Sequence, residues 1–133
     1  MKIPFFYRDT DGIRITVRPV HLSDQSDPEG RQFVFAYFVR IENTREETVQ
    51  LLSRRWLIHD STGEDSEVAG DGVVGEQPVL APGAVHDYQS FCVLKSAHGT
   101  MEGQYHFMKQ DGHKLTAQIP KFILDATADA GWN

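Results

Sequence analysis

Cysteine is almost absent from this sequence, and its absence excludes the covalent frameworks that cysteine supports. Cys92 is the single cysteine of the 133-residue chain, so neither an intrachain disulfide nor a cysteine metal cluster can form. It lies in the apolar run SFCVL, which favours a buried structural thiol over a nucleophile, because a catalytic thiol needs a positioned base. A lone free thiol suits a reducing compartment, and we expect a cytoplasmic protein.

Long apolar runs and a basic excess are missing too. No stretch of about 18 consecutive apolar residues occurs, which argues against a membrane-spanning helix, and the first residues lack the pattern of a signal peptide. The 13 basic residues are outnumbered by 19 acidic ones, for a net charge of −6. Nucleic-acid binders usually carry a basic patch, and none is evident here. We therefore expect no membrane and no nucleic acid as partner.

Helical periodicity is missing as well, whereas apolar and polar residues alternate through most of the chain. The residues from Ile13 to Val17 alternate in this way, which is typical of a strand with one buried face. QFVFAYFVRIEN is apolar on both faces over its first half and predicts a central strand. TVQLLSRRWLIHD changes phase near Ser53, which predicts a β-bulge. The pair Asp111-Gly112 predicts a hairpin turn.

About seven short strands joined by turns predict an all-β protein, an antiparallel β-sandwich of the immunoglobulin-like type. We expect this single domain to span residues 13–124. Residues 1–12 are then an N-terminal extension, residues 125–133 a C-terminal tail, and DSTGEDSE a hairpin-like connector.

The stretch VAGDGVVGEQP carries glycines with the G-x-G-x-x-G spacing of a dinucleotide-binding loop. That loop must open a helix at its third glycine, and the prolines and glycine that follow cannot do so. We therefore expect a turn with positive φ or close backbone approach. An anion nest of backbone N–H groups remains the alternative, although the neighbouring carboxylates would repel a phosphate. The candidate loop consists of Gly70, Asp71, Gly72, Val73, Val74 and Gly75.

Other constellations that carry chemistry are not evident. The six histidines show no zinc-ligand spacing, and the G-x-S-x-G elbow of serine hydrolases does not occur. We therefore expect no enzyme, no catalytic or metal-binding residues and no cofactor. Arg54, Trp56 and Tyr88 are candidate interface residues, since exposed aromatic residues mark interfaces. Core packing is the simpler interpretation of both aromatic residues and is favoured for Trp56.

Several segments in one order resemble the ApaG family, also called the DUF525 domain, from about Ile13 to Leu124. The most specific is V-x-G-x-G-V-V-G-x-Q-P-x-L-x-P-G, from Val68 to Gly83. The others are F-A-Y, V-Q-L-L-x-R-x-W, G-x-M-x-G-x-Y and I-P-x-F, which begin at Phe35, Val49, Gly99 and Ile119. Where the family usually has a small glycine after Tyr-Gln-Ser, this chain has Phe91.

The resemblance implies a fibronectin type III-like sandwich and a protein-interaction role. Bacterial members are often encoded near a diadenosine tetraphosphate hydrolase, and related domains occur in F-box proteins and a polymerase-delta-interacting protein. The leading hypothesis is thus a non-enzymatic module that binds a protein partner through a sheet edge or the glycine loop, with a homodimer also considered. The alternatives are phosphate, pyrophosphate or nucleotide binding by that loop and a role in magnesium and cobalt homeostasis.

Overall fold

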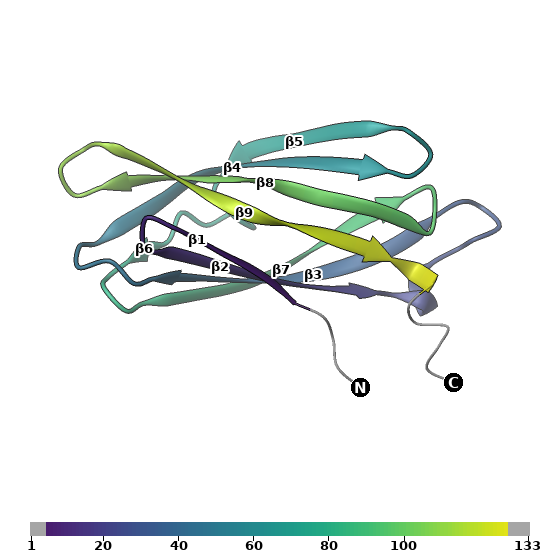
Figure 1. The fold of residues 1–133 in the computed structure, drawn as a ribbon, viewed down its shortest axis with the longest axis horizontal. Coiled ribbons are helices and arrows are strands. Elements are labelled where there is room, and N and C mark those ends of the chain that lie inside the picture. Colours follow the sequence, from purple (N-terminus) through teal and green to yellow (C-terminus); the bar gives the residue numbers. More distant parts are fainter. Residues whose placement is uncertain (1–4, 128–133) are drawn as a thin grey trace.

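Two antiparallel sheets pack face to face in the computed structural model, which describes residues 5–127. Sheet I has the strand order β1-β2-β3-β7, and sheet II the order β5-β4-β8-β9, with β6 also paired to β4 (Figure 1). The strands are β1 (Phe6–Thr10), β2 (Ile13–His21), β3 (Phe33–Asn43), β4 (Val49–Asp60), β5 (Asp65–Asp71), β6 (Val79–Leu80), β7 (Val85–Leu94), β8 (His98–Lys109) and β9 (Lys114–Asp125). A 3₁₀ helix, η1 (Ser23–Gln25), follows β2.

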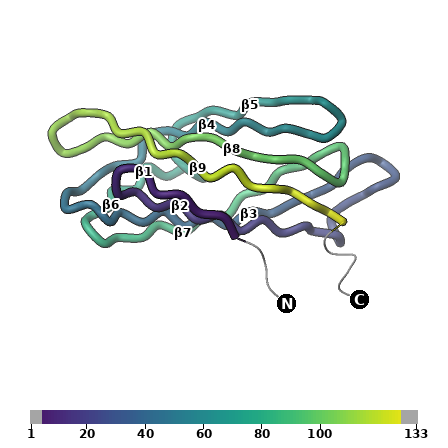
Figure 2. The backbone as a smooth tube through the Cα atoms, in the orientation of Figure 1, coloured from purple at the N-terminus to yellow at the C-terminus, as the bar shows by residue number. Residues whose placement is uncertain are grey.

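The sandwich is closed on one side and open on the other. β9 contacts both β1 and β2, and Figure 2 shows β9 beside β1, although the two strands lie at opposite ends of the chain. The opposite side has β7 as the edge of sheet I and β5 as the edge of sheet II.

The core follows from the alternation in the sequence. Ile13, Ile15 and Val17 are fully buried, while the residues between them face outward, which places one face of β2 against sheet II. Trp56 lies at the centre of the core, with its ring centroid 5.2 Å from that of Tyr37 and 5.9 Å from that of Phe122. Burial of such large aromatic side chains dominates the energetics of a core of this size. The predicted all-β sandwich is confirmed.

Two strands differ from the sequence-based expectation. Within residues 1–12, assigned to an extension, β1 pairs residue by residue with β2 through a turn in which Asp11 and Gly12 have φ of 48° and 84°. Positive φ at both central residues is the mark of a type I′ hairpin. The expected connector DSTGEDSE ends inside β5, because its turn closes at Gly63, whose N–H donates to the carbonyl oxygen of Asp60.

Other expectations match the structure. The register of β4 against β8 shifts between Leu51 and Ser53, so the predicted bulge near Ser53 is confirmed. The Asp111-Gly112 turn joins β8 to β9, and Gly112 has φ of 84°. Of the predicted C-terminal tail, β9 extends to Asp125, and residues 128–133 lie outside the described residues.

Candidate functional site

The glycine stretch ends one strand and forms a tight turn of its own. β5 includes Gly70 and Asp71. Val73 and Glu76 then exchange two backbone hydrogen bonds, of 2.8 and 3.0 Å, around Val74 and Gly75, which have φ of 47° and 79°. This is again a type I′ turn, and a β-branched residue is strained at its first central position.

Three N–H groups of this loop already donate to backbone carbonyl oxygens of the protein. Gly72 N–H donates to the carbonyl oxygen of Leu52 at 2.8 Å, and the N–H groups of Val73 and Glu76 bond within the turn. A Cβ at Gly72 would lie 2.3 Å from the carbonyl oxygen of Glu76, so this glycine is required by close backbone approach.

Arg54 joins the loop to the interior. It lies on the same face of β4 as buried Trp56, and its Nη1 donates to the carbonyl oxygens of Asp71 and Gly72 at 3.0 and 2.8 Å. The loop therefore presents oxygens to a cation instead of N–H groups to an anion. Sequence reasoning singled out the glycines and Arg54 separately, and the structure brings them together.

Tyrosines from both sheets gather beside Arg54. The hydroxyl groups of Tyr88 on β7 and Tyr105 on β8 are hydrogen-bonded to each other. Burial raises the pKa of both hydroxyls and that of Tyr37, while the positive charge of Arg54 acts in the opposite direction. These hydroxyl groups are therefore neutral near pH 7, and the Tyr88–Tyr105 hydrogen bond links the two sheets.

The other candidate residues divide between the core and the opening. Trp56 is 2% exposed, so core packing holds for it and its side chain offers no surface to a partner. Tyr88 is half-buried at the open side. Cys92 is buried, as expected, and burial raises the pKa of its thiol to about 11, which makes it a poor nucleophile.

Among residues 5–127, the open edge of β7 leaves backbone N–H and C=O groups without a partner strand on this side. Asn43 exchanges hydrogen bonds with Gly83 and Ala84 just before β7. Because bonded and non-bonded pairs alternate in antiparallel ladders, even-numbered residues of β7 then bond to β3. The odd-numbered ones, including Gln89 and Phe91, direct their N–H and C=O groups to the open edge.

The other sheet edges carry devices that discourage pairing, and β7 does not. β9 contains Pro120, Lys114 and Lys121, β1 lies against β9, and β5 has three acidic residues among seven. β7 pairs ten residues with β3 without a bulge. It has no proline or lysine, and its one charged side chain, Asp87, is held by Arg40 at 2.9 Å. Charges, prolines and bulges are the usual protection of an edge strand.

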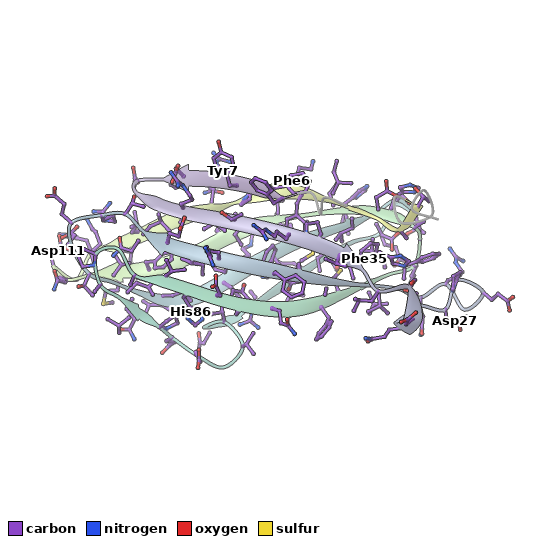
Figure 3. All side chains as sticks on the ribbon, turned by 90° about the horizontal axis from the view of Figure 1, so that it is seen from below. Phe6, Tyr7, Asp27, Phe35, His86 and Asp111 are labelled. Carbon is purple, nitrogen blue, oxygen red and sulfur yellow. The ribbon has the colours of Figure 1, made fainter. Side chains whose placement is uncertain are left out.

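The outer face of sheet I adds exposed apolar surface beside this edge. Figure 3 views this face, with Phe6 and Tyr7 on the strand at one edge and His86 on the strand at the other. Phe91 and Val93 of β7 are 56% and 59% exposed. A groove of about 970 Å³ crosses the face. Its lining includes Phe5, Tyr7, Arg18, Phe38 and Gln89. Exposed apolar patches of this kind mark interaction surfaces.

The described residues, 5–127, lack the marks of a metal centre and of a membrane-spanning helix. No group of three or more histidine, cysteine, aspartate or glutamate side chains in this range is placed to hold a metal ion. No helix in the same range is long and apolar enough to cross a membrane.

The fold and this open side define a β-sandwich domain of the fibronectin type III and immunoglobulin-like class. The model of the ApaG domain, DUF525, matches residues 23–109, and the chain belongs to the ApaG family. It is 51% identical over 115 residues to the protein ApaG of Anaeromyxobacter dehalogenans, which is 86% of this chain and 90% of that relative. It is 42% identical over 127 residues to the protein ApaG of Maricaulis maris, covering 96% and 98%. A crystal structure of a Bordetella pertussis protein named ApaA superposes with a TM-score of 0.83 at 42% identity, covering 90% and 94%.

Sequence reasoning missed the residues that make β7 an open edge. Gln89, Phe91 and Val93 were not candidates, because alternation shows which residues share a face but not which strand lies at an edge. One signal was available: the ten residues VHDYQSFCVL hold neither proline nor lysine.

Proposed function

We propose that the chain is a non-enzymatic module that binds a protein partner through the open edge of β7. The observation that supports this is the contrast between β7 and the other edges: ten residues long, unprotected, and flanked by exposed Phe91 and Val93. Unpaired backbone groups give affinity to an added strand, and neighbouring side chains give it specificity. The buried, unreactive thiol of Cys92 suits work in a reducing compartment such as the cytoplasm.

The geometry favours this proposal over phosphate or nucleotide binding by the glycine loop. Three N–H groups of the loop are bonded to Leu52 or within the turn, and the charge nearest its carbonyl oxygens is that of Arg54. Asp71 and Glu76 add negative charge on the outside, which opposes an anion. A role in divalent-cation homeostasis has no particular observation in its favour here.

Site-specific photo-crosslinking in cells tests the proposal. A benzophenone amino acid placed at Gln89 on β7 should capture a partner. The same group at Thr116, which is exposed on β9, serves as the matched control and should not. The captured protein must also bind the purified chain and be displaced by free unlabelled chain. Equal capture from both positions, or capture from Thr116 alone, would contradict binding at β7.

A further inference from the structure

We infer that the partner binds as a single extended segment that pairs antiparallel with β7 and is covered by β5. This segment carries a basic residue near its C-terminal end. The inference deepens the proposed function and rests on it. The space concerned, called the slot below, lies beside the open edge of β7 and under the inner face of β5.

The slot exists because β5 extends beyond sheet I. β7 lies over β8, as shown by the hydroxyl contact between Tyr88 and Tyr105. At its far end, Lys95 N–H donates to the Asp60 carboxylate at the end of β4, at 2.6 Å. β5 is the next strand outward from β4, so it projects past β7. Six of its seven residues are exposed, all but Gly70, as expected of a strand that nothing covers.

The inner face of β5 carries apolar surface that an added strand would cover. Val68 pairs with Trp56, and residues directly opposite in a sheet share a face. Trp56 is in the core, yet Val68 is 43% exposed. Packed sheets lie about 10 Å apart, so side chains of a strand paired to β7 would reach Val68. A fifth strand of sheet I would thus complete the sandwich.

The projecting β5 excludes a second copy of the chain from this edge. If two copies paired antiparallel through β7, their sheets I would form one sheet, and both sheets II would lie on the same face of it. β5 of each copy would then occupy the place of β4 of the other. One strand fits under β5, whereas a whole sandwich does not.

The end of the slot beside the start of β7 carries a carboxylate. Glu76 lies beside the start of β7, with its carboxylate 3.7 Å from Nε2 of His86. Asp71, two residues beyond Ala69 on β5, lies on the outer face of that strand and does not face the slot. A segment antiparallel to β7 ends at this point, so a lysine or arginine there would pair with the Glu76 carboxylate. Antiparallel pairing is also the more stable arrangement per residue.

Substitutions at two neighbouring residues test whether the inner face of β5 covers the bound segment. Val68→Arg fills the slot, whereas Ala69→Arg places the same side chain on the outer face of β5, because Ala69 pairs with exposed Arg55. Both positions are exposed, so both variants should fold. The probe is a capped seven-residue peptide of alternating threonine and valine that ends in lysine. The peptide is titrated into the chain at millimolar concentration. Binding is followed by hydrogen exchange and by NMR shifts of the chain's amides.

We expect the peptide to protect the amides of Gln89 and Phe91, and Val68→Arg to weaken its binding by about tenfold or more, while Ala69→Arg changes it by less than about twofold. Replacing the terminal lysine by glutamate should weaken binding, and adding salt should remove that difference. No protection of these amides, equal effects of the two variants, or dimerisation of the free chain through β7 would each overturn the inference. If the partner crosslinked at Gln89 still binds in those cases, the proposed function stands without it. If nothing is captured at Gln89, the proposed function itself fails.

Discussion

Arg54 and Gly72 are joined by a 2.8 Å hydrogen bond from Nη1 to the carbonyl oxygen. This bond fixes the orientation of the glycine loop, because it turns a backbone oxygen inward to a cation. A hydrogen bond with a charged donor contributes about 1.5–3 kcal/mol. The loop is therefore held in place at one end of the open side. Its residues are the ones whose glycine spacing resembles a nucleotide-binding motif in the sequence.

The turn inside the loop should be improved by one substitution. Val74 has φ of 47° and lies 65% exposed in a type I′ turn, where asparagine is the favoured residue. We predict that Val74→Asn raises the free energy of unfolding by about 1 kcal/mol. Gly72→Ala should lower it by more than that, since its Cβ would meet the carbonyl oxygen of Glu76. Urea unfolding measures both, and a destabilised Val74→Asn would contradict the turn geometry.

Pyrophosphate should not bind the glycine loop. Its N–H groups at Gly72, Val73 and Glu76 already have carbonyl partners, and releasing them would leave those oxygens unpaired. We predict no shift change at these amides when millimolar pyrophosphate is titrated at low salt. Saturable shifts centred on Gly72 to Glu76 would restore the phosphate interpretation.

The tyrosine pair should respond unequally to loss of its two hydroxyl groups. Tyr105 is fully buried, whereas Tyr88 is half-buried near solvent. Tyr88→Phe leaves the buried Tyr105 hydroxyl without its partner, and we expect a cost of about 1–3 kcal/mol. Tyr105→Phe should cost less, because the Tyr88 hydroxyl can turn to water. The double variant should cost less than the sum of the single ones. Additive costs in denaturant titrations would show that the hydroxyls do not interact.

Asp60 should make stability depend on pH in the acid range. Burial raises the pKa of its carboxyl group, but hydrogen bonds from Ser96, Lys95 and Thr62 outweigh burial and lower it overall. A carboxyl group whose pKa is lower in the folded state contributes stability above its unfolded pKa and loses it as pH falls through the folded value. Asp60→Asn should therefore destabilise the protein at pH 7 by about 1–3 kcal/mol. The difference should shrink below about pH 4. A difference that is constant with pH would contradict this role.

Much of the fold could be predicted from alternation, and what could not was decided by neighbours in space. Strands such as β2 are predictable because one face is buried, which produces an alternation of apolar and polar residues. β1 has no such pattern, since its side chains are mostly exposed, although Asp11-Gly12 is a hairpin signal of the kind recognised at Asp111-Gly112. The start of β5 was assigned to an acidic connector for the same reason. No other strand among residues 5–127 covers β5, so its sequence lacks the apolar alternation that predicts a strand.

The candidate site was predicted only in pieces. The glycines marked a turn correctly, and Arg54 was a candidate residue, but sequence spacing could not show that the guanidinium group binds the loop. Trp56 is a core residue because two sheets meet over it. Gln89 and Phe91 matter because β7 is at an edge, which depends on strand order rather than on any local pattern.

Two substitutions at Gln89 test the central claim most directly. Gln89→Pro removes an N–H that faces the open edge, and proline is tolerated at such positions, whereas Gln89→Ala removes the side chain and keeps the N–H. Both should fold like the parent chain by circular dichroism. The measurement is the dissociation constant of the partner crosslinked at this position. The account predicts at least about tenfold weaker binding for the proline variant than for the alanine variant. Equal binding by the two folded variants would contradict it.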